Sequence, residues 1–163
     1  MSEQKLLLQQ FEQELKTTLK ILKAYPADKP DIKPAEKSRT AKDLIWTMVQ
    51  DIQMAIQGLK GTIDWESISA PSPGTIEEMI KAFEDYSKKF KSKLKNVKPD
   101  KFKKSKVEFF VAPGKTGKIL VSGLAWLLLK DQIHHRGQLS VYYRVAGAKL
   151  PSIYGPTADE PWH

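Results

Sequence analysis

The sequence has 163 residues, no cysteine, and 27 basic against 19 acidic side chains, a formal net charge of +8. The lack of cysteine excludes disulfides, thiolate metal ligands and a cysteine nucleophile. No stretch approaches the roughly 20 apolar residues of a membrane span, and the early acidic residues of the N-terminal segment argue against a signal peptide. We therefore expect a single domain, residues 1–163, located in the cytoplasm.

Residues 2–24 predict the first helix, because apolar side chains recur on one face at helical spacing. Three prolines, spaced four apart over residues 26–34, then favour a long extended connection. The second helix begins at Ser38 or Thr40, and Thr40 with Asp43 resembles a capping box. Its expected inward face consists of Leu44, Thr47, Met48, Asp51, Ile52, Ala55 and Leu59.

A loop over residues 62–74 leads to a third helix, which opens with a clearer capping box and ends before Pro99. Ten lysines lie between Lys88 and Lys106, from the second half of this helix into the segment after it, with few aromatic residues among them. Arginine and interleaved aromatics are more typical of nucleic-acid binding, so we interpret this run as a solvated helix end and basic loop. Residues 107–111 then favour a short extended segment, followed by a Pro113-Gly114 turn.

Residues 118–147 predict one long amphipathic helix that ends at Gly147, where a left-handed C-cap is common. Several polar side chains interrupt its apolar pattern, and buried polar groups cost free energy unless they are paired. The tail after this helix contains three prolines, and we expect it to pack back on the bundle. The fold class is therefore all-α, a four-helix bundle with long crossover connections.

The segment HHRGQLSVYYRVAGAKLPSIYGP resembles the DinB/YfiT-like family of small bacterial four-helix bundles. Arg39-Thr40 followed by Ile45-Trp46 also matches the family's second-helix pattern. The resemblance implies a divalent metal site at the centre of the bundle. Its usual ligands are one histidine on the second helix and an H-x-x-x-H pair on the last, whose spacing places both imidazoles on one face. In some relatives such a site serves thiol-dependent transfer, in which the metal lowers the pKa of a bound thiol or water.

This chain departs from that ligand set. His135 matches the second histidine of the pair, Asp131 stands at the position of the first, and Thr47 stands at the position of the second-helix histidine. A carboxylate and an imidazole suit zinc, nickel, iron or manganese, whereas a neutral hydroxyl is a weak ligand. Asp51 lies one turn beyond Thr47, and we infer from helix geometry alone that it is a substitute ligand. Without a metal, Asp131 and His135 would instead form an ion pair or hydrogen bond one turn apart.

Two further polar residues are candidates for the pocket. His134 lies about 100° around the helix from His135, so both cannot point at one ion, and we expect it to form a hydrogen bond at an interface or with the tail. Arg136, like Arg144, is expected to anchor the acidic tail, and the alternative is that it binds a substrate anion. We expect no role for the terminal His163.

The sequence thus favours a DinB-like metal-dependent enzyme, a hydrolase or thiol transferase acting on a small molecule, with a degenerate Thr/Asp/His version of the three-histidine site. We expect it to be a homodimer formed through helix faces. The alternative is a non-catalytic, metal-free DinB-like binding or stress-related protein. A bound metal and an open pocket between the second and last helices would separate the two. A nucleic-acid-binding protein, the third class, would show strongly salt-dependent retention on DNA.

Overall fold

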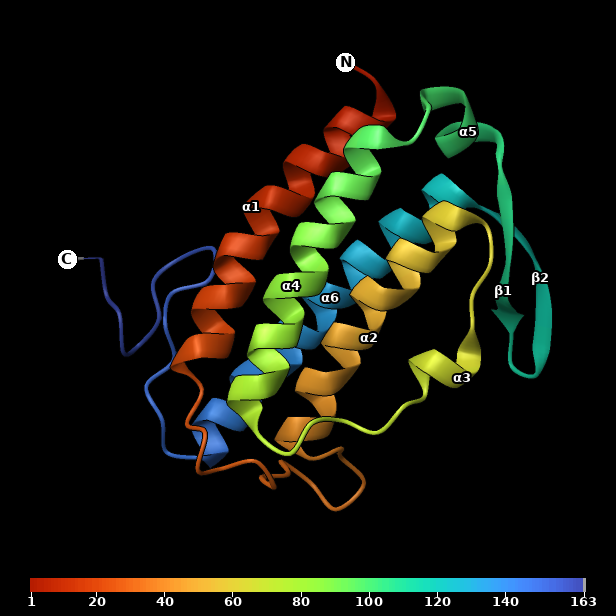
Figure 1. Ribbon diagram of the computed structural model, residues 1–163. Coiled ribbons are helices and arrows are strands. Elements are labelled where there is room, and N and C mark those ends of the chain that lie inside the picture. Colours follow the sequence, from red (N-terminus) through yellow and green to blue (C-terminus); the bar gives the residue numbers. More distant parts are fainter. Residues whose placement is uncertain (163) are drawn as a thin grey trace.

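The computed structural model describes residues 1–162, so His163 lies outside the described residues. Four long helices form a bundle (Figure 1): α1 (Glu3–Ala24), α2 (Ala41–Lys60), α4 (Ile76–Asn96) and α6 (Val121–Val145). Two short helices, α3 (Trp65–Ile68) and α5 (Pro99–Lys104), and a hairpin of β1 (Lys106–Ala112) and β2 (Lys115–Leu120) complete the elements. The predicted helical fold class is confirmed.

The helix starts follow the capping residues in the sequence. The Thr40 side chain accepts a hydrogen bond from the backbone N–H of Asp43 at 3.2 Å, which begins α2. Thr75 and Glu78 form a complete capping box at the start of α4. Because these caps satisfy N–H groups that have no partner inside the helix, they set where the long connections end.

Helix α6 packs against both α1 and α2, and α4 closes the other side of the bundle. The core between them is apolar, with Phe11 of α1 meeting Phe90 of α4 edge to face at 4.8 Å between ring centroids. Met48 of α2 and Tyr143 of α6 are fully buried in the same cluster. The polar side chains on α6 are therefore held by a rigid, well-packed scaffold.

The predicted start of the last helix is wrong. Residues 118–120 belong to β2, where Ile119 pairs with Val107 and Leu120 with Lys106. A turn at Pro113 and Gly114, with φ 68° at the glycine, brings the two strands together, and this pairing extends the backbone up to the N-cap at Leu120. The predicted left-handed glycine is confirmed, because Gly147 has φ 67° and follows Ala146, the residue after the end of α6.

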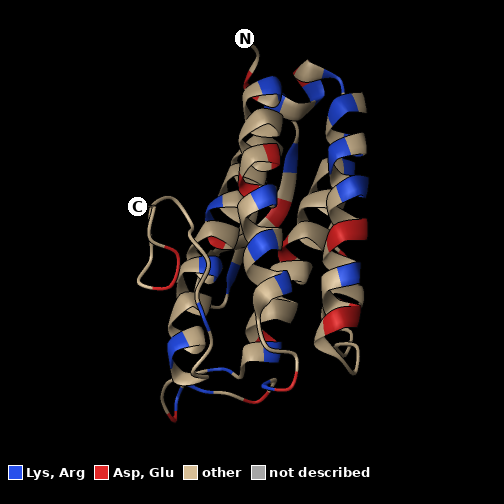
Figure 2. Ribbon diagram, turned by 90° about the vertical axis from the view of Figure 1, so that its left-hand side faces the viewer, with Lys and Arg blue, Asp and Glu red and all other residues tan. Residues whose placement is uncertain are grey.

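The lysine-rich segment and the tail can also be compared with what the sequence predicts. The lysines between Lys88 and Lys106 are almost all exposed, although six residues of the expected basic loop form α5. Figure 2 marks the basic residues in blue along the helices. The tail packs back on the bundle, where Arg144 pairs with Asp159, and Glu160 accepts from Lys20 at 2.6 Å. Among the helices described, none combines the length and apolar character needed to cross a membrane.

Candidate metal centre and its pocket

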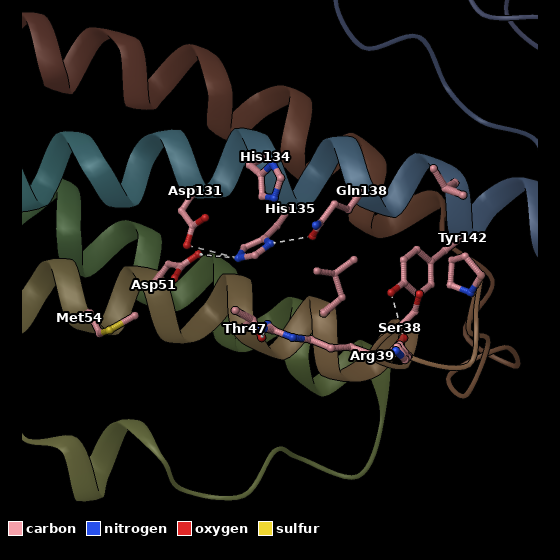
Figure 3. A pocket seen from close by; sticks show the side chains of 14 residues that line it. Ser38, Arg39, Thr47, Asp51, Met54, Asp131, His134, His135, Gln138 and Tyr142 are labelled. Atoms are coloured by element: carbon pink, nitrogen blue, oxygen red, sulfur yellow. Dashed lines mark hydrogen bonds and ion pairs between the residues drawn. The ribbon is translucent and has the colours of Figure 1, made fainter. Parts of the chain in front are cut away.

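Two neighbouring helices bring three potential ligands together: α2 supplies Asp51, and α6 supplies Asp131 and His135 (Figure 3). One ligand atom from each lies within 4.8 Å of the others. His135 Nε2 is 3.4 Å from Asp131 Oδ2 and 4.0 Å from Asp51 Oδ2. The i,i+4 spacing on α6 explains why two of the three share a face. We call these three residues the metal cluster.

The distances and the chemistry of the metal cluster fit a small divalent ion. Nitrogen and oxygen ligands bound at about 2.0–2.2 Å lie roughly 3–4 Å from one another around the ion. The two distances measured from His135 Nε2 fall in that range. One imidazole and two carboxylates are donors that zinc, iron, manganese and nickel accept. The cluster could therefore hold such an ion with little rearrangement.

Asp51 is the most constrained member of the metal cluster, because only 1% of it is exposed. Burial, followed by the charge of Asp131, raises the pKa of its carboxyl to about 8, against the opposing effects of Arg39 and of the Gln132 amide. A buried carboxyl in this state needs either a proton or a cation. A divalent ion would satisfy that need and favour the ionised form.

Two glutamines on α6 orient the metal cluster. The Gln132 amide donates to Asp51 Oδ2 at 3.2 Å and also to the Met48 carbonyl. Gln138 Oε1 lies 3.0 Å from His135 Nδ1. In the tautomer with its proton on Nδ1, His135 donates to Gln138 and turns a free Nε2 lone pair towards the carboxylates. Outer partners of this kind are common around metal-binding histidines.

The metal cluster opens into a pocket of about 730 Å³ between α2 and α6. The lining includes residues of the long connection before α2 as well as both helices. Asp131 faces this space with 42% of its side chain exposed. A volume of this size admits a small molecule beside the cluster. The pocket lies between the second and last long helices, the place where an open pocket would favour the metal-dependent enzyme over the metal-free alternative.

Thr47 lines the pocket, but its hydroxyl is engaged by other groups. It accepts a hydrogen bond from Arg39 Nη1 at 2.8 Å and donates to the carbonyl of Asp43 at 2.9 Å. Asp51, one turn further along α2, is the residue that joins Asp131 and His135. The structure therefore favours the substitute ligand over the residue that stands at the histidine position.

The other two candidates lie apart from the metal cluster. His134 lines the same pocket, with its ring centroid 5.5 Å from that of His135. Arg136 lies outside the pocket lining and faces α1, since consecutive helical residues point about 100° apart. It pairs with Glu14 at 2.7 Å and stacks on Tyr154 of the tail at 4.9 Å. Its expected part in anchoring the tail is confirmed through Tyr154.

Sequence reasoning missed Arg39 as a pocket residue. The Arg39 side chain reaches the pocket from the connection that precedes α2 (Figure 3). The hydroxyl of Tyr142 donates to the Arg39 carbonyl at 2.9 Å and fixes its backbone. The available signal was the Arg39-Thr40 pair, but the direction of the side chain depends on the path of the whole connection.

Comparisons with known proteins place the chain among similar small helical proteins. Residues 1–162 match the model of the DinB family. The uncharacterized protein YrdA of Bacillus subtilis (strain 168) is 25% identical over 153 residues, 94% of this chain and 89% of that protein.

Solved structures show the same fold. A DinB-like protein of Bacillus cereus has a TM-score of 0.75 at 24% identity and covers 91% of this chain and 95% of its own. The DinB-like protein YjoA of Bacillus subtilis has a TM-score of 0.70 at 20% identity, over 90% of this chain and 96% of its own. At these identities the likeness extends to the fold alone.

Proposed function

Because this chain belongs to the DinB family, we propose that it binds a divalent metal ion through Asp51, Asp131 and His135. The observation that carries the proposal is the buried Asp51 carboxyl beside Asp131 and His135, all facing one open pocket. Zinc, nickel, iron and manganese all suit this donor set. Three protein ligands would leave positions open towards the pocket.

The finer proposal is that the protein is a hydrolase or thiol transferase acting on a small molecule. A bound ion would supply Lewis-acid activation of water or of a thiol. The residues of the chain would hold the ion and give the substrate access to it. Asp51 and Asp131 balance the charge of the ion, Gln138 holds the His135 ring, and the open side of the pocket admits the substrate.

A metal-free binding protein is the second candidate. Asp131 and His135 lie 3.4 Å apart, so they can satisfy each other without an ion. Asp51 would then remain protonated near neutral pH, since its pKa is raised to about 8. The pocket would still be open to a ligand, but the metal cluster would only support the fold.

Metal content separates the two candidates. We expect wild-type protein, purified without a histidine tag and reconstituted with zinc or manganese, to hold close to one ion per chain. His135→Ala and Asp51→Asn should lose that ion, and His134→Ala should keep it as the matched control, because His134 lies in the pocket but outside the metal cluster. Wild type that binds no ion after reconstitution would overturn the proposal. The homodimer remains a prediction, which light scattering on the same samples tests.

A further inference from the structure

The three arginines of the chain have different partners. Arg136 pairs with Glu14, and Arg144 pairs with Asp159. Within residues 1–162, Arg39 has no carboxylate at ion-pair distance, and its guanidinium donates only to the hydroxyl of Thr47. A guanidinium carries five donors in a planar fork, so most of its capacity stays free.

Two acidic residues close to Arg39 in the sequence have other partners. Asp43 accepts from the hydroxyl of Thr40 at the start of α2. Asp31 pairs with Lys42 at 2.8 Å. Arg39 therefore has no ion-pair partner among residues 1–162, and its charge acts on the Asp51 carboxyl only from beyond ion-pair distance.

Arg39 is an exposed residue that lines the pocket, and one hydrogen bond holds its guanidinium there. The hydroxyl of Thr47 holds its end at 2.8 Å, and Tyr142 holds its backbone carbonyl at 2.9 Å. Figure 3 shows the Arg39 side chain lying along the pocket from Ser38 towards Thr47, with Asp131 and His135 on the opposite side. An arginine held in this way loses less conformational freedom when it binds an anion.

The pocket is consequently divided by charge. Lys37 and Arg39 line it at the connection before α2, and the acidic residues belong to the metal cluster. Apolar surface from Leu44 and Val141 also faces the pocket. A ligand that complements this division has an anionic group at one end and a short apolar body.

We propose that Arg39 is the anion-binding residue of this pocket and that the ligand is a small carboxylic acid. Its carboxylate would pair with the free edge of the guanidinium, which matches two oxygens in one plane. Its apolar body would lie over Leu44 and Val141, and its other end would reach the metal cluster. The orientation of that other end rests on the proposed function, whereas the anion site itself does not need a metal.

Binding of a simple carboxylate tests the proposal. We would titrate metal-free and zinc-loaded protein with hexanoate, and with 1-hexanol as the uncharged control, and follow amide chemical shifts by NMR at neutral pH. Arg39→Gln should weaken hexanoate binding about fivefold, which corresponds to about 1 kcal/mol. Arg39→Lys should keep part of the affinity, because it retains the charge but not the fork. Lys33→Gln, which removes an exposed cation of the same connection outside the pocket lining, should have no effect.

The outcomes separate this inference from the proposed function. Arg39-dependent binding of hexanoate in protein that holds no metal would support the anion site while the metal proposal fails. Hexanoate that binds only to zinc-loaded protein, and equally well to Arg39→Gln, would overturn the anion site and leave the metal proposal intact. Equal affinity for hexanoate and 1-hexanol would also overturn the anion site. Inorganic phosphate that binds more tightly than hexanoate and displaces it would overturn the assignment of a carboxylic acid.

Discussion

Arg136 and Asp51 are equally buried, with 1% of each exposed, yet their surroundings differ. Arg136 donates to the hydroxyl of Thr18 and to the backbone of Glu14, pairs with the Glu14 carboxylate, and reaches Tyr154. These four residues form what we call the tail cluster. Asp51 of the metal cluster has one hydrogen bond, from Gln132, and an acidic neighbour.

The difference shows how buried polar groups can be interpreted in this bundle. The charge of Arg136 is compensated by groups of the chain itself, so its contribution is to hold α1, α6 and the tail together. For Asp51, the His135 imidazole at 4.0 Å, the charge of Arg39 and the Gln132 amide do not offset burial, so its carboxyl needs a proton or a cation from solution. The tail cluster therefore has a structural role, and the metal cluster is the candidate functional site.

Replacing Arg136 should have the largest effect. Arg136→Met leaves the Glu14 carboxylate without its cation, and breaking a buried pair costs about 3–5 kcal/mol. Glu14 keeps 15% of its side chain exposed, so we expect the lower end of that range. Urea denaturation measures the free energy of unfolding. Arg136→Met combined with Glu14→Gln should recover part of the loss, and a single variant as stable as wild type would remove the distinction between the clusters.

The pH dependence of metal-free protein comes next. Burial raises the pKa of Asp51 from 3.8 to about 8, so the folded state binds a proton more tightly than the unfolded state. Its contribution to stability is complete below about pH 4 and is lost as the pH rises through about 8, so the free energy of unfolding has a negative slope against pH in this range. Asp51→Asn should flatten this slope. Urea denaturation at several pH values in this range, with and without zinc, measures the slope. Identical slopes in wild type and Asp51→Asn without zinc would contradict the expected protonation of Asp51.

Replacing Gln138, the hydrogen-bond partner of His135, should have a smaller effect, and this effect is on metal affinity. Gln138→Met removes the oxygen near Nδ1, and loss of such a partner typically lowers metal affinity about tenfold or more. Competition with a fluorescent zinc chelator measures the dissociation constant. Lys130→Met, an exposed change on the same helix, serves as the control. Unchanged affinity in Gln138→Met would mean that the ring is oriented by packing alone.

The smallest effect is expected in the tail. The backbone N–H of Leu150 and the guanidinium of Arg144 hold the pKa of Asp159 below its usual value. This attachment is therefore present above about pH 4 and is lost as the pH falls through the lowered pKa. Asp159→Asn should shift the Leu150 amide resonance and speed its hydrogen exchange at neutral pH, with little change in global stability. An unaltered Leu150 amide would show that Asp159 does not hold this part of the tail.

Much of the fold could be predicted because it depends on local patterns. The capping residues Thr40 and Thr75 and the C-cap Gly147 mark helix ends that the structure reproduces within a residue or two. The error at residues 118–120 has a physical cause, since Ile119 and Leu120 fit a helical face as well as a strand. Only the pairing with Lys106 and Val107, which depends on the turn between the strands, decides between them.

The candidate site was predictable in part. The resemblance to the family's H-x-x-x-H pair implies Asp131 and His135, which share a helix face, and Asp51 follows from its place one turn beyond Thr47 on α2. The Arg39–Thr47 hydrogen bond could not be predicted, because it depends on how residues 25–40 return to α2. Periodicity carries no information about such a path.

The position of α6 in the chain has a consequence for biosynthesis. The first residue of α6, Val121, follows the last residue of α2, Lys60, by 61 positions, so at 5–20 residues per second it is synthesised about 3–12 s later. Helix α4 contacts both α1 and α2, so these three helices can begin to associate during this interval. Asp51 would then stay hydrated and ionised until α6 docks. The desolvation of Asp51 therefore coincides with the docking of α6, and the proposed binding of a cation would belong to the same step.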